Sequence, residues 1–375
     1  MTVEKITLRC FRNHRETEIY FDHKSNILVG KNGQGKTNIL EALSYLCLTK
    51  SFFGAHDTTV VMIGEPSFSI EGTFTLGNER KAVVQTAFSA PTNEKSITVN
   101  THKLEKRSDH IGRFPVVILS PEYSAITMGG PAERRRFIDL AIAQSSSVYL
   151  DDIIEYRKIL RQRNAILSDA KVRRTEPQES ISAWDESFLQ RAGNIIHRRR
   201  IFLEKFSRQI VTAYGTLTGE KEIPGIEYLP GRKGNTVEEI TTGLKRELDE
   251  KKNDELRIGI TLVGPHRDEI LFTLNNQEIR KYASQGQHKT FLIAMKIAEY
   301  HLLKELCTEV PIVLLDDVVS ELDEERTRRL INQVAGLGQT FITTTEKTFV
   351  DRWVSTGQHT TKVEVTNGTA SYVYV

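Results

Sequence analysis

Residues 30–37 read GKNGQGKT, the pattern of a phosphate-binding loop, in which a glycine and four further residues precede Gly-Lys-Thr. The apolar run over 27–29 before it is typical of a buried strand, and residues 36–48 place apolar side chains on one helical face. In such a loop the glycines turn backbone N–H groups toward phosphate, and the helix N-terminus adds partial positive charge. The alternative is a Gly-rich turn that only connects strand to helix.

The loop predicts a site for ATP and Mg²⁺. Lys36 would bridge the β- and γ-phosphates, and the Thr37 hydroxyl would bind Mg²⁺. The side chain of Lys31 is expected in solvent. The predicted cofactor-binding residues of this segment are Gly30, Lys31, Asn32, Gly33, Gln34, Gly35, Lys36 and Thr37.

A second acidic segment follows much later, where the apolar run over 312–315 ends in Asp316 and Asp317. A buried parallel strand that delivers carboxylates at its C-terminal end has this form. We expect this strand beside the phosphate-loop strand. Asp316 would then hold Mg²⁺, directly or through water, and Asp317 would orient or deprotonate the attacking water. Taken alone, two aspartates at a strand end are equally compatible with a helix cap.

Ser284-Gln285-Gly286-Gln287 stands before a strongly helical segment with one apolar face. Ser284 is a plausible N-cap, and a helix start of this kind can bind an anion through its hydroxyl and N–H groups. An isolated motif of this sort is usually only a cap. Its position in the chain favours a functional role over a simple cap, because Ser320-Glu321-Leu322-Asp323 follows the acidic strand.

The order of these four motifs resembles that of ABC-type ATPases. The resemblance implies that two ATP molecules are sandwiched in a symmetric dimer. The phosphate loop of one subunit would then face residues of the other. The residues implied to complete the cofactor site in this way are Ser284, Gly286, Gln287 and Asp323.

Longer stretches, at residues 129–139, 264–269 and 284–287, resemble the RecF family of bacteria. This resemblance covers nearly the whole chain. It implies an α/β ABC-type ATPase head with an inserted helical lobe and no long coiled coil. It also implies ATP-dependent dimerisation on DNA, weak ATP hydrolysis, and loading of recombinase at single-strand gaps together with RecR and RecO.

Three features depart from transporter-type ABC proteins. Thr344 stands where transporters carry a switch histidine, and residues 120–122 offer no glutamine at the junction of the lobes. Asp317 replaces the usual glutamate, and its shorter side chain would hold water less well. These three departures favour a protein that hydrolyses ATP slowly, as a switch, over one that uses ATP hydrolysis to drive movement.

Three segments are expected from the pattern of elements: residues 1–120 and 257–375 as the two halves of ATPase lobe I, and residues 121–256 as a helical lobe II. Helices are predicted from Pro131, over 148–167 and over 181–214, whereas strand-like alternation returns over 257–263. The arm lacks sustained heptads, so a long coiled coil is not expected.

Any DNA contact must come from local patches, because the formal net charge is only +2. Positive charge concentrates on the helical insert, where duplex backbone is the expected target. Few aromatic residues accompany it, so a stacking platform for single strands is not evident. The arginines predicted to bind DNA are Arg134, Arg135, Arg136, Arg157, Arg161, Arg173 and Arg174.

Composition excludes several other classes. The three cysteines have no paired spacing, which argues against a disulfide framework or a zinc site. No secretory signal and no run of about 20 apolar residues is visible, so a cytoplasmic location without a membrane span is expected. The alternative function is the ATP-binding subunit of a membrane transporter, and a small-molecule kinase is a third.

The segment His266-Arg267-Asp268 invites a catalytic interpretation, yet a turn before a strand over 270–274 would use the same residue types. We expect a structural or coupling role near the nucleotide. Asn275 and Asn276 would form the hairpin turn that follows.

Overall fold

The chain folds into two compact units in a computed structural model that describes residues 1–173, 178–219, 222–230, 234–318, 324–355, 357 and 359–373. The first unit comprises Met1–Ser124, Thr212–Lys221 and Gln285–Val375, and the second comprises Ala125–Val211 and Glu222–Ser284. Residues 257–284, which we expected in lobe I, therefore group with the inserted unit.

A six-stranded sheet of the first unit carries the phosphate loop, in the order β15-β14-β3-β13-β12-β8. Neighbouring strands run parallel, except for the antiparallel pair of β14 and β15. Both β3 and β12 are buried along their whole length, which explains their continuous apolar sequence. The strands are β3 (Ser25–Val29), β8 (Val116–Leu119), β12 (Ile312–Asp316), β13 (Thr340–Thr344), β14 (Thr360–Thr366) and β15 (Thr369–Val373).

The two strands expected over 27–29 and 312–315 are confirmed, but their expected adjacency is wrong. β13 lies between β3 and β12 and pairs with both. Parallel strands are joined by crossover connections, so chain order does not determine which strands are neighbours. Because β13 pairs with β12, Thr343 is in register with Asp316.

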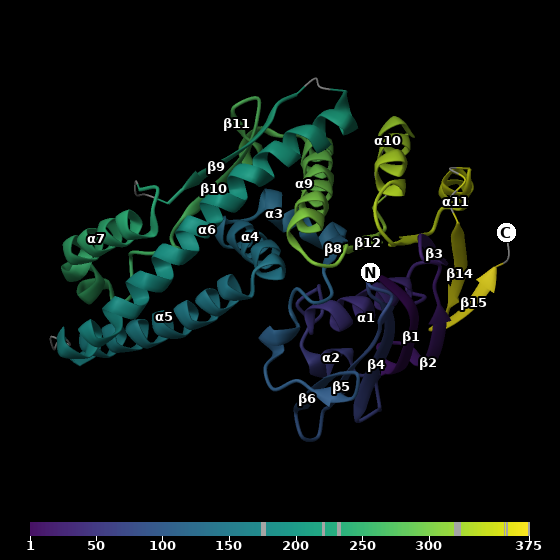
Figure 1. Cartoon of the computed structure of the whole chain (residues 1–375), viewed down its shortest axis with the longest axis horizontal. Coiled ribbons are helices and arrows are strands. Elements are labelled where there is room, and N and C mark those ends of the chain that lie inside the picture. Colours follow the sequence, from purple (N-terminus) through teal and green to yellow (C-terminus); the bar gives the residue numbers. More distant parts are fainter. Residues whose placement is uncertain are drawn as a thin grey trace. The chain divides into compact units, whose positions relative to one another are not determined.

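An antiparallel sheet completes the first unit, in the order β2-β1-β4-β5-β6-β7 (Figure 1). Burial alternates along β4 and β5, so one face of this sheet is packed and the other is more exposed. On the packed face, the rings of Phe11, Tyr45 and Phe68 have centroids 5.3 to 5.6 Å apart. The strands are β1 (Thr2–Phe11), β2 (His14–Tyr20), β4 (Ser67–Thr75), β5 (Lys81–Ser89), β6 (Glu94–Val99) and β7 (His102–Lys103).

Helix α1 (Lys36–Leu48) has the bounds expected from the sequence and contacts strands of both sheets. It is buried on nearly all sides, which explains why apolar residues occupy most of its length. It ends at Thr49, whose φ of 60° is left-handed and whose N–H donates to the Tyr45 carbonyl. The other helices of this unit are α2 (Asp57–Val60), η1 (Arg107–His110), η2 (Pro121–Ser124), α9 (Gln285–Leu306), α10 (Glu324–Ala335) and α11 (Lys347–Val354).

The two long helices predicted over 148–167 and 181–214 are present as α5 and α6, which pair as a helical hairpin (Figure 1). Most of α6 belongs to the second unit, and its residues from Thr212 on group with the first. Within the described ranges this pair forms a short arm and not a long coiled coil. α4 begins at Pro131 as predicted. We did not anticipate α7, although Thr236 and Glu239 form a capping box at its start. The helices are α3 (Ala125–Met128), α4 (Pro131–Ser145), α5 (Ser147–Arg173), α6 (Gln178–Thr218), α7 (Val237–Ile258) and α8 (Ile279–Tyr282).

The second unit is not all-helical, because it holds the antiparallel sheet β11-β10-β9. Pairing of β9 (Pro224–Leu229) with β10 (Glu269–Leu274) keeps the latter in this unit, and β11 (Gln277–Glu278) follows. The strand predicted over 257–263 is wrong, since α7 runs to Ile258 and ends at Gly259, with φ 86°. The hairpin turn at Asn275 and Asn276 is confirmed, with φ of 52° and 62°.

Candidate nucleotide-binding site

The phosphate loop connects β3 to α1 through two left-handed glycines. Gly33 and Gly35 adopt φ values of 77° and 110°, which glycine reaches at little cost. At Gly35 a Cβ would also lie 2.6 Å from Oδ1 of Asn13 and 2.8 Å from Nε2 of His14. Among the described residues, the backbone N–H groups of Lys36 and Thr37 have no protein acceptor. These groups suit an anion at the start of α1.

Lys36 folds back over the loop. Its Nζ donates to the carbonyl oxygens of Gly30 at 2.7 Å and Lys31 at 2.9 Å, and the residue is 7% exposed. Burial lowers the pKa of the ammonium, whereas the negative charges of Asp317 and Asp316 oppose that shift. A buried cation whose hydrogen bonds go to neutral carbonyl oxygens is suited to pair with phosphate.

Hydroxyl groups from three segments of the chain lie close to the carboxylate of Asp316. Its Oδ1 accepts hydrogen bonds from Thr37 at 2.7 Å and from Thr343 at 2.8 Å, and its Oδ2 lies 3.4 Å from Ser120 Oγ. The prediction that Thr37 and Asp316 share one site therefore agrees with their positions.

These oxygen ligands fit Mg²⁺, which prefers one or two carboxylates together with phosphate oxygens and water. Thr37 and Asp316 would hold the ion. In the described part of the chain no three His, Cys, Asp or Glu side chains group as a metal-binding set. At sites of this kind the nucleotide and solvent supply the remaining ligands.

Asp317 leaves the strand in a left-handed conformation, with φ 47°. Its backbone N–H donates to Oγ1 of Thr343 at 3.0 Å. Thr344, which stands where transporters carry a switch histidine, accepts a hydrogen bond from the N–H of Glu346 through its hydroxyl. Thr343 was missed because its role depends on β13 lying beside β12, which the sequence does not reveal.

Two hairpin turns brace the phosphate loop. From the β1–β2 turn, Asn13 Nδ2 donates to the Gln34 carbonyl at 3.0 Å and His14 Nε2 lies 3.1 Å from the Gly35 carbonyl. From the β14–β15 turn, Gly368 N donates to the Gln34 carbonyl at 2.9 Å. Burial lowers the pKa of His14. The loop is thereby held by side chains from one turn and by the backbone of the other.

The Ser-x-Gly-Gln segment lies where the sequence placed it, at the start of a helix. Ser284 directly precedes α9, and Gly286 and Gln287 belong to its first turn. A Cβ on Gly286 would lie 2.9 Å from Nη1 of Arg326. Asp323, the fourth residue expected from the dimer arrangement, lies outside the described residues.

The segment around His266 is part of the second unit and is tied into its interior. His266 Nδ1 lies 2.6 Å from the Tyr156 hydroxyl, and Nε2 lies 3.1 Å from the Thr261 carbonyl. Burial lowers the pKa of His266 to about 4, so the ring is neutral and both nitrogens are engaged. Asp268 accepts from Tyr228 and pairs with the buried Arg199 at 3.7 Å. These contacts support the structural interpretation.

The arginines predicted to contact DNA fall into two groups. Arg134 is buried and pairs with Glu269 at 2.8 Å, and Arg135 donates to the Asp268 carbonyl at 2.6 Å. These two residues hold α4 against β10, so Arg134 is unavailable to a phosphate. Arg174 lies outside the described residues. The remaining predicted arginines are exposed on α4 and α5, namely Arg136, Arg157, Arg161 and Arg173.

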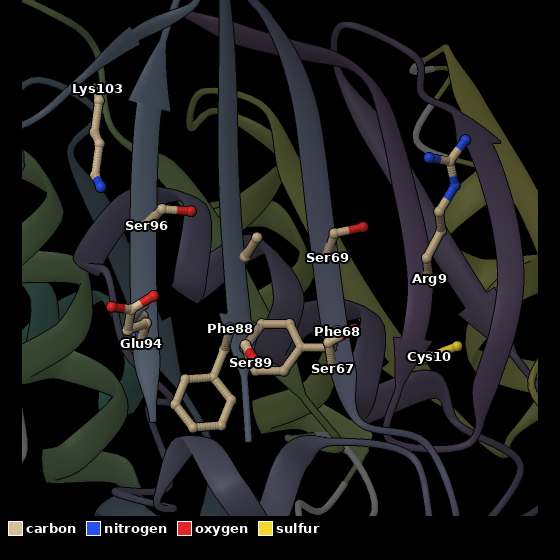
Figure 2. Close-up of a pocket in the computed structure, with 12 residues that line it drawn as sticks. Arg9, Cys10, Ser67, Phe68, Ser69, Phe88, Ser89, Glu94, Ser96 and Lys103 are labelled. Carbon is tan, nitrogen blue, oxygen red and sulfur yellow. The ribbon is translucent and has the colours of Figure 1, made fainter. Parts of the chain in front are cut away.

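A hollow of about 730 Å³ lies on the antiparallel sheet, and its lining residues include none of the predicted nucleotide-binding residues. Figure 2 shows the hydroxyls of Ser69 and Ser96 on separate strands, with Arg9 and Lys103 toward opposite sides of the view. It is lined by residues of strands β1, β4, β5, β6 and β7, among them four serines. It is therefore distinct from the site between β3 and α1.

Comparisons with known proteins show what the whole chain is similar to. The model of the RecF/RecN/SMC N terminal domain matches residues 2–369. The DNA replication and repair protein RecF of Chloroherpeton thalassium is 41% identical over 354 residues, covering 92% of this chain and 95% of that protein. RecF of Salinibacter ruber is 39% identical over 353 residues, covering 92% and 85%.

Two solved structures extend the comparison to the fold. The recombination mediator protein RecF-ATP in the RecFOR pathway has a TM-score of 0.90 at 29% identity, covering 100% of this chain and 98% of that one. An Smc head bound to the C-winged helix domain of ScpA has a TM-score of 0.58 at 13% identity, covering 100% and 98%. Among the described residues, no helix combines the length and apolar character that crossing a bilayer requires.

Proposed function

The chain belongs to the RecF family, and we propose that it is an ATP-controlled protein of DNA replication and repair that closes as a dimer on DNA. Slow hydrolysis of ATP would then separate the copies and release the DNA. The observation that carries this proposal is the 2.7 Å hydrogen bond between Thr37 Oγ1 and Asp316 Oδ1, which joins segments 279 residues apart into one nucleotide site.

The side chains at the site divide the chemistry among them. Lys36 would exchange its two carbonyl acceptors for phosphate oxygens, which carry more negative charge. The Thr37 hydroxyl can keep donating its proton to Asp316 while its oxygen binds the metal. When bound, Mg²⁺ supplies positive charge that stabilises the phosphates. The Asp317 carboxylate would accept the proton of the attacking water.

A second copy would complete the site. Helix α9 starts next to Ser284, and its first turn contains Gly286 and Gln287. The start of a helix presents backbone N–H groups to an anion, which supports a role for Ser284, Gly286 and Gln287 in closing over the γ-phosphate held by another copy.

ATP would favour association of the two copies because it binds more tightly to the closed dimer than to the separate copies. A ligand shifts an equilibrium only by its difference in affinity between the two states. ATP that contacts both copies has such a difference, and ADP without the γ-phosphate has less. Asp317 in place of a longer glutamate fits slow hydrolysis, so the closed state would persist as a timed switch.

DNA would bind through the exposed arginines of the helical arm. Arg157 and Arg161 are one helical turn apart on α5 and are exposed to solvent. Guanidinium groups on a helix surface suit phosphates without reading bases. We therefore propose duplex backbone as the main target, including duplex beside a gap, with binding that weakens steeply as salt rises.

Family membership supports a proposal for the cellular role. We propose that the protein cooperates with RecR and RecO to load recombinase at single-strand gaps. The relatives that align with 92% of the chain are RecF proteins and not transporter subunits, so the transporter alternative has no support. Loading of recombinase on gapped DNA, with each of the three proteins omitted in turn, measures this role.

Sedimentation velocity tests the switch directly. Wild-type protein is compared without nucleotide, with ADP and Mg²⁺, and with ATP and Mg²⁺, each with and without duplex DNA. We expect a dimer only with ATP. A chain that stays monomeric at saturating ATP and micromolar protein would refute the proposal.

A further inference from the structure

The hydroxyl of Thr343 connects the two acidic residues of the site. It donates to Asp316 Oδ1 at 2.8 Å and accepts from the backbone N–H of Asp317 at 3.0 Å. We infer that Thr343 is a positioning residue that orients both carboxylates for Mg²⁺ binding and hydrolysis. This inference rests on the proposed ATPase function and names a residue beyond the four motifs.

Strand register places Thr343 at this point. β13 and β12 run parallel, and Thr343 is the neighbour of Asp316 across the pair. Side chains of neighbours in register project to the same face of a sheet. Thr343 is 1% exposed and Asp316 is 5% exposed, so water does not readily replace either hydrogen bond.

The bond to Asp317 supports an uncommon backbone conformation. A φ of 47° is rarely adopted by an L-residue other than glycine, asparagine or aspartate. The ladder between β12 and β13 ends at Asp316, and the Thr343 hydroxyl supplies an acceptor where a strand carbonyl would otherwise serve. The hydroxyl thus fixes the turn from which the Asp317 side chain departs.

The bond to Asp316 fixes the rotation of its carboxylate. Oδ1 accepts from both Thr37 and Thr343, whereas the contact of Oδ2 with Ser120 is 3.4 Å long. Of the two oxygens, Oδ2 therefore keeps more acceptor capacity for a cation. Without Thr343, the carboxylate would be free to rotate about Thr37 and the preference between its oxygens would be lost.

Substitution of Thr343→Val tests the inference, because valine keeps the shape and removes the hydroxyl. Thermal unfolding is followed with ATPγS in EDTA and with ATPγS at increasing Mg²⁺. We expect the Mg²⁺ concentration for half of the metal-dependent stabilisation to rise about 10- to 100-fold. Stabilisation by ATPγS in EDTA stays at the wild-type level, because the phosphate loop is unchanged. In steady-state hydrolysis, kcat falls and KM for ATP changes little.

Two matched variants separate positioning from packing. Thr343→Ser keeps the hydroxyl and should restore the wild-type Mg²⁺ dependence. Thr344→Val removes an equally buried hydroxyl that contacts neither carboxylate, and it should leave this dependence unchanged. If Thr343→Val does not fold, Thr343→Ala takes its place, since the smaller side chain leaves room for water beside the Asp317 N–H.

The outcomes distinguish this inference from the function on which it rests. Wild-type Mg²⁺ dependence and kcat in Thr343→Val, or in its alanine replacement, would overturn the inference alone. An equal shift in Thr344→Val would do the same, because it would indicate a general loosening of β13. A wild-type chain that ATPγS does not stabilise at all would overturn the proposed function as well.

Discussion

Thr37 and Asp316 stand 279 residues apart in the sequence, and the hydroxyl of the first donates to the carboxylate of the second at 2.7 Å. This bond ties the first turn of α1 to the C-terminal end of β12. It makes the phosphate loop and the acidic strand parts of one site.

Lys36→Arg should abolish ATP-driven dimerisation. The ammonium of Lys36 fits between two loop carbonyls at 2.7 and 2.9 Å, and the larger planar guanidinium cannot take that place. Sedimentation velocity with ATP and Mg²⁺ measures the effect. Lys31→Arg is the matched control and should dimerise like the wild type. Dimers of Lys36→Arg at wild-type ATP concentrations would contradict the assignment.

Asp317→Asn should slow hydrolysis while leaving ATP binding intact. The amide keeps the size of the side chain but cannot accept a proton from water, a loss of about 10²- to 10⁴-fold in general-base catalysis. The ATP-bound dimer should persist for longer, as seen by the rate at which it dissociates after excess ADP is added. Dissociation at the wild-type rate together with wild-type kcat would exclude Asp317 as the base.

Arg157→Gln and Arg161→Gln should weaken DNA binding uniformly across sequences. Each lost phosphate contact should lower the slope of log affinity against log salt by about 0.9. Fluorescence anisotropy with gapped, duplex and single-stranded DNA, with and without ATP, gives both quantities. Arg208→Gln, which removes an exposed arginine paired with Glu204 on α6, is the control. An unchanged salt slope in the double variant would place the DNA elsewhere.

The fold should lose stability in mild acid through His266. Burial lowers its pKa to about 4, below the unfolded value of about 6.5, so the unfolded chain binds the proton first as pH falls. The stabilisation is present above pH 6.5 and is lost between about pH 6.5 and 4, amounting to at most about 3 kcal/mol. The free energy of unfolding, measured with urea at several pH values across this range, should vary less with pH for His266→Asn than for the wild type. The exposed-site control His102→Asn should retain the wild-type slope.

Local patterns were sufficient to predict some elements of both units. The bounds of α1 followed from the loop before it and the apolar face within it, and the Asn275-Asn276 turn followed from residues that tolerate positive φ. Both features depend on residues close together in sequence. Such features are the ones that a single sequence specifies most directly.

Long-range features were not accessible in the same way. The place of β13 between β3 and β12 depends on crossover connections, and with it the role of Thr343. In the short sheet of the second unit, β9 pairs with β10 although α7 separates the two strands in the sequence. Neither strand alone therefore predicted this sheet. Arg134 and Arg199 lie in arginine-rich stretches that are typical of a basic surface. In the structure both are buried and pair with carboxylates from distant segments.

The most direct measurement is a structure of the protein with ATPγS and Mg²⁺. It should show two copies, with the triphosphate held by Lys36 of one chain and the γ-phosphate within hydrogen-bond distance of Ser284 of the other. A dimer in which Ser284 faces away from both nucleotides would contradict the central claim.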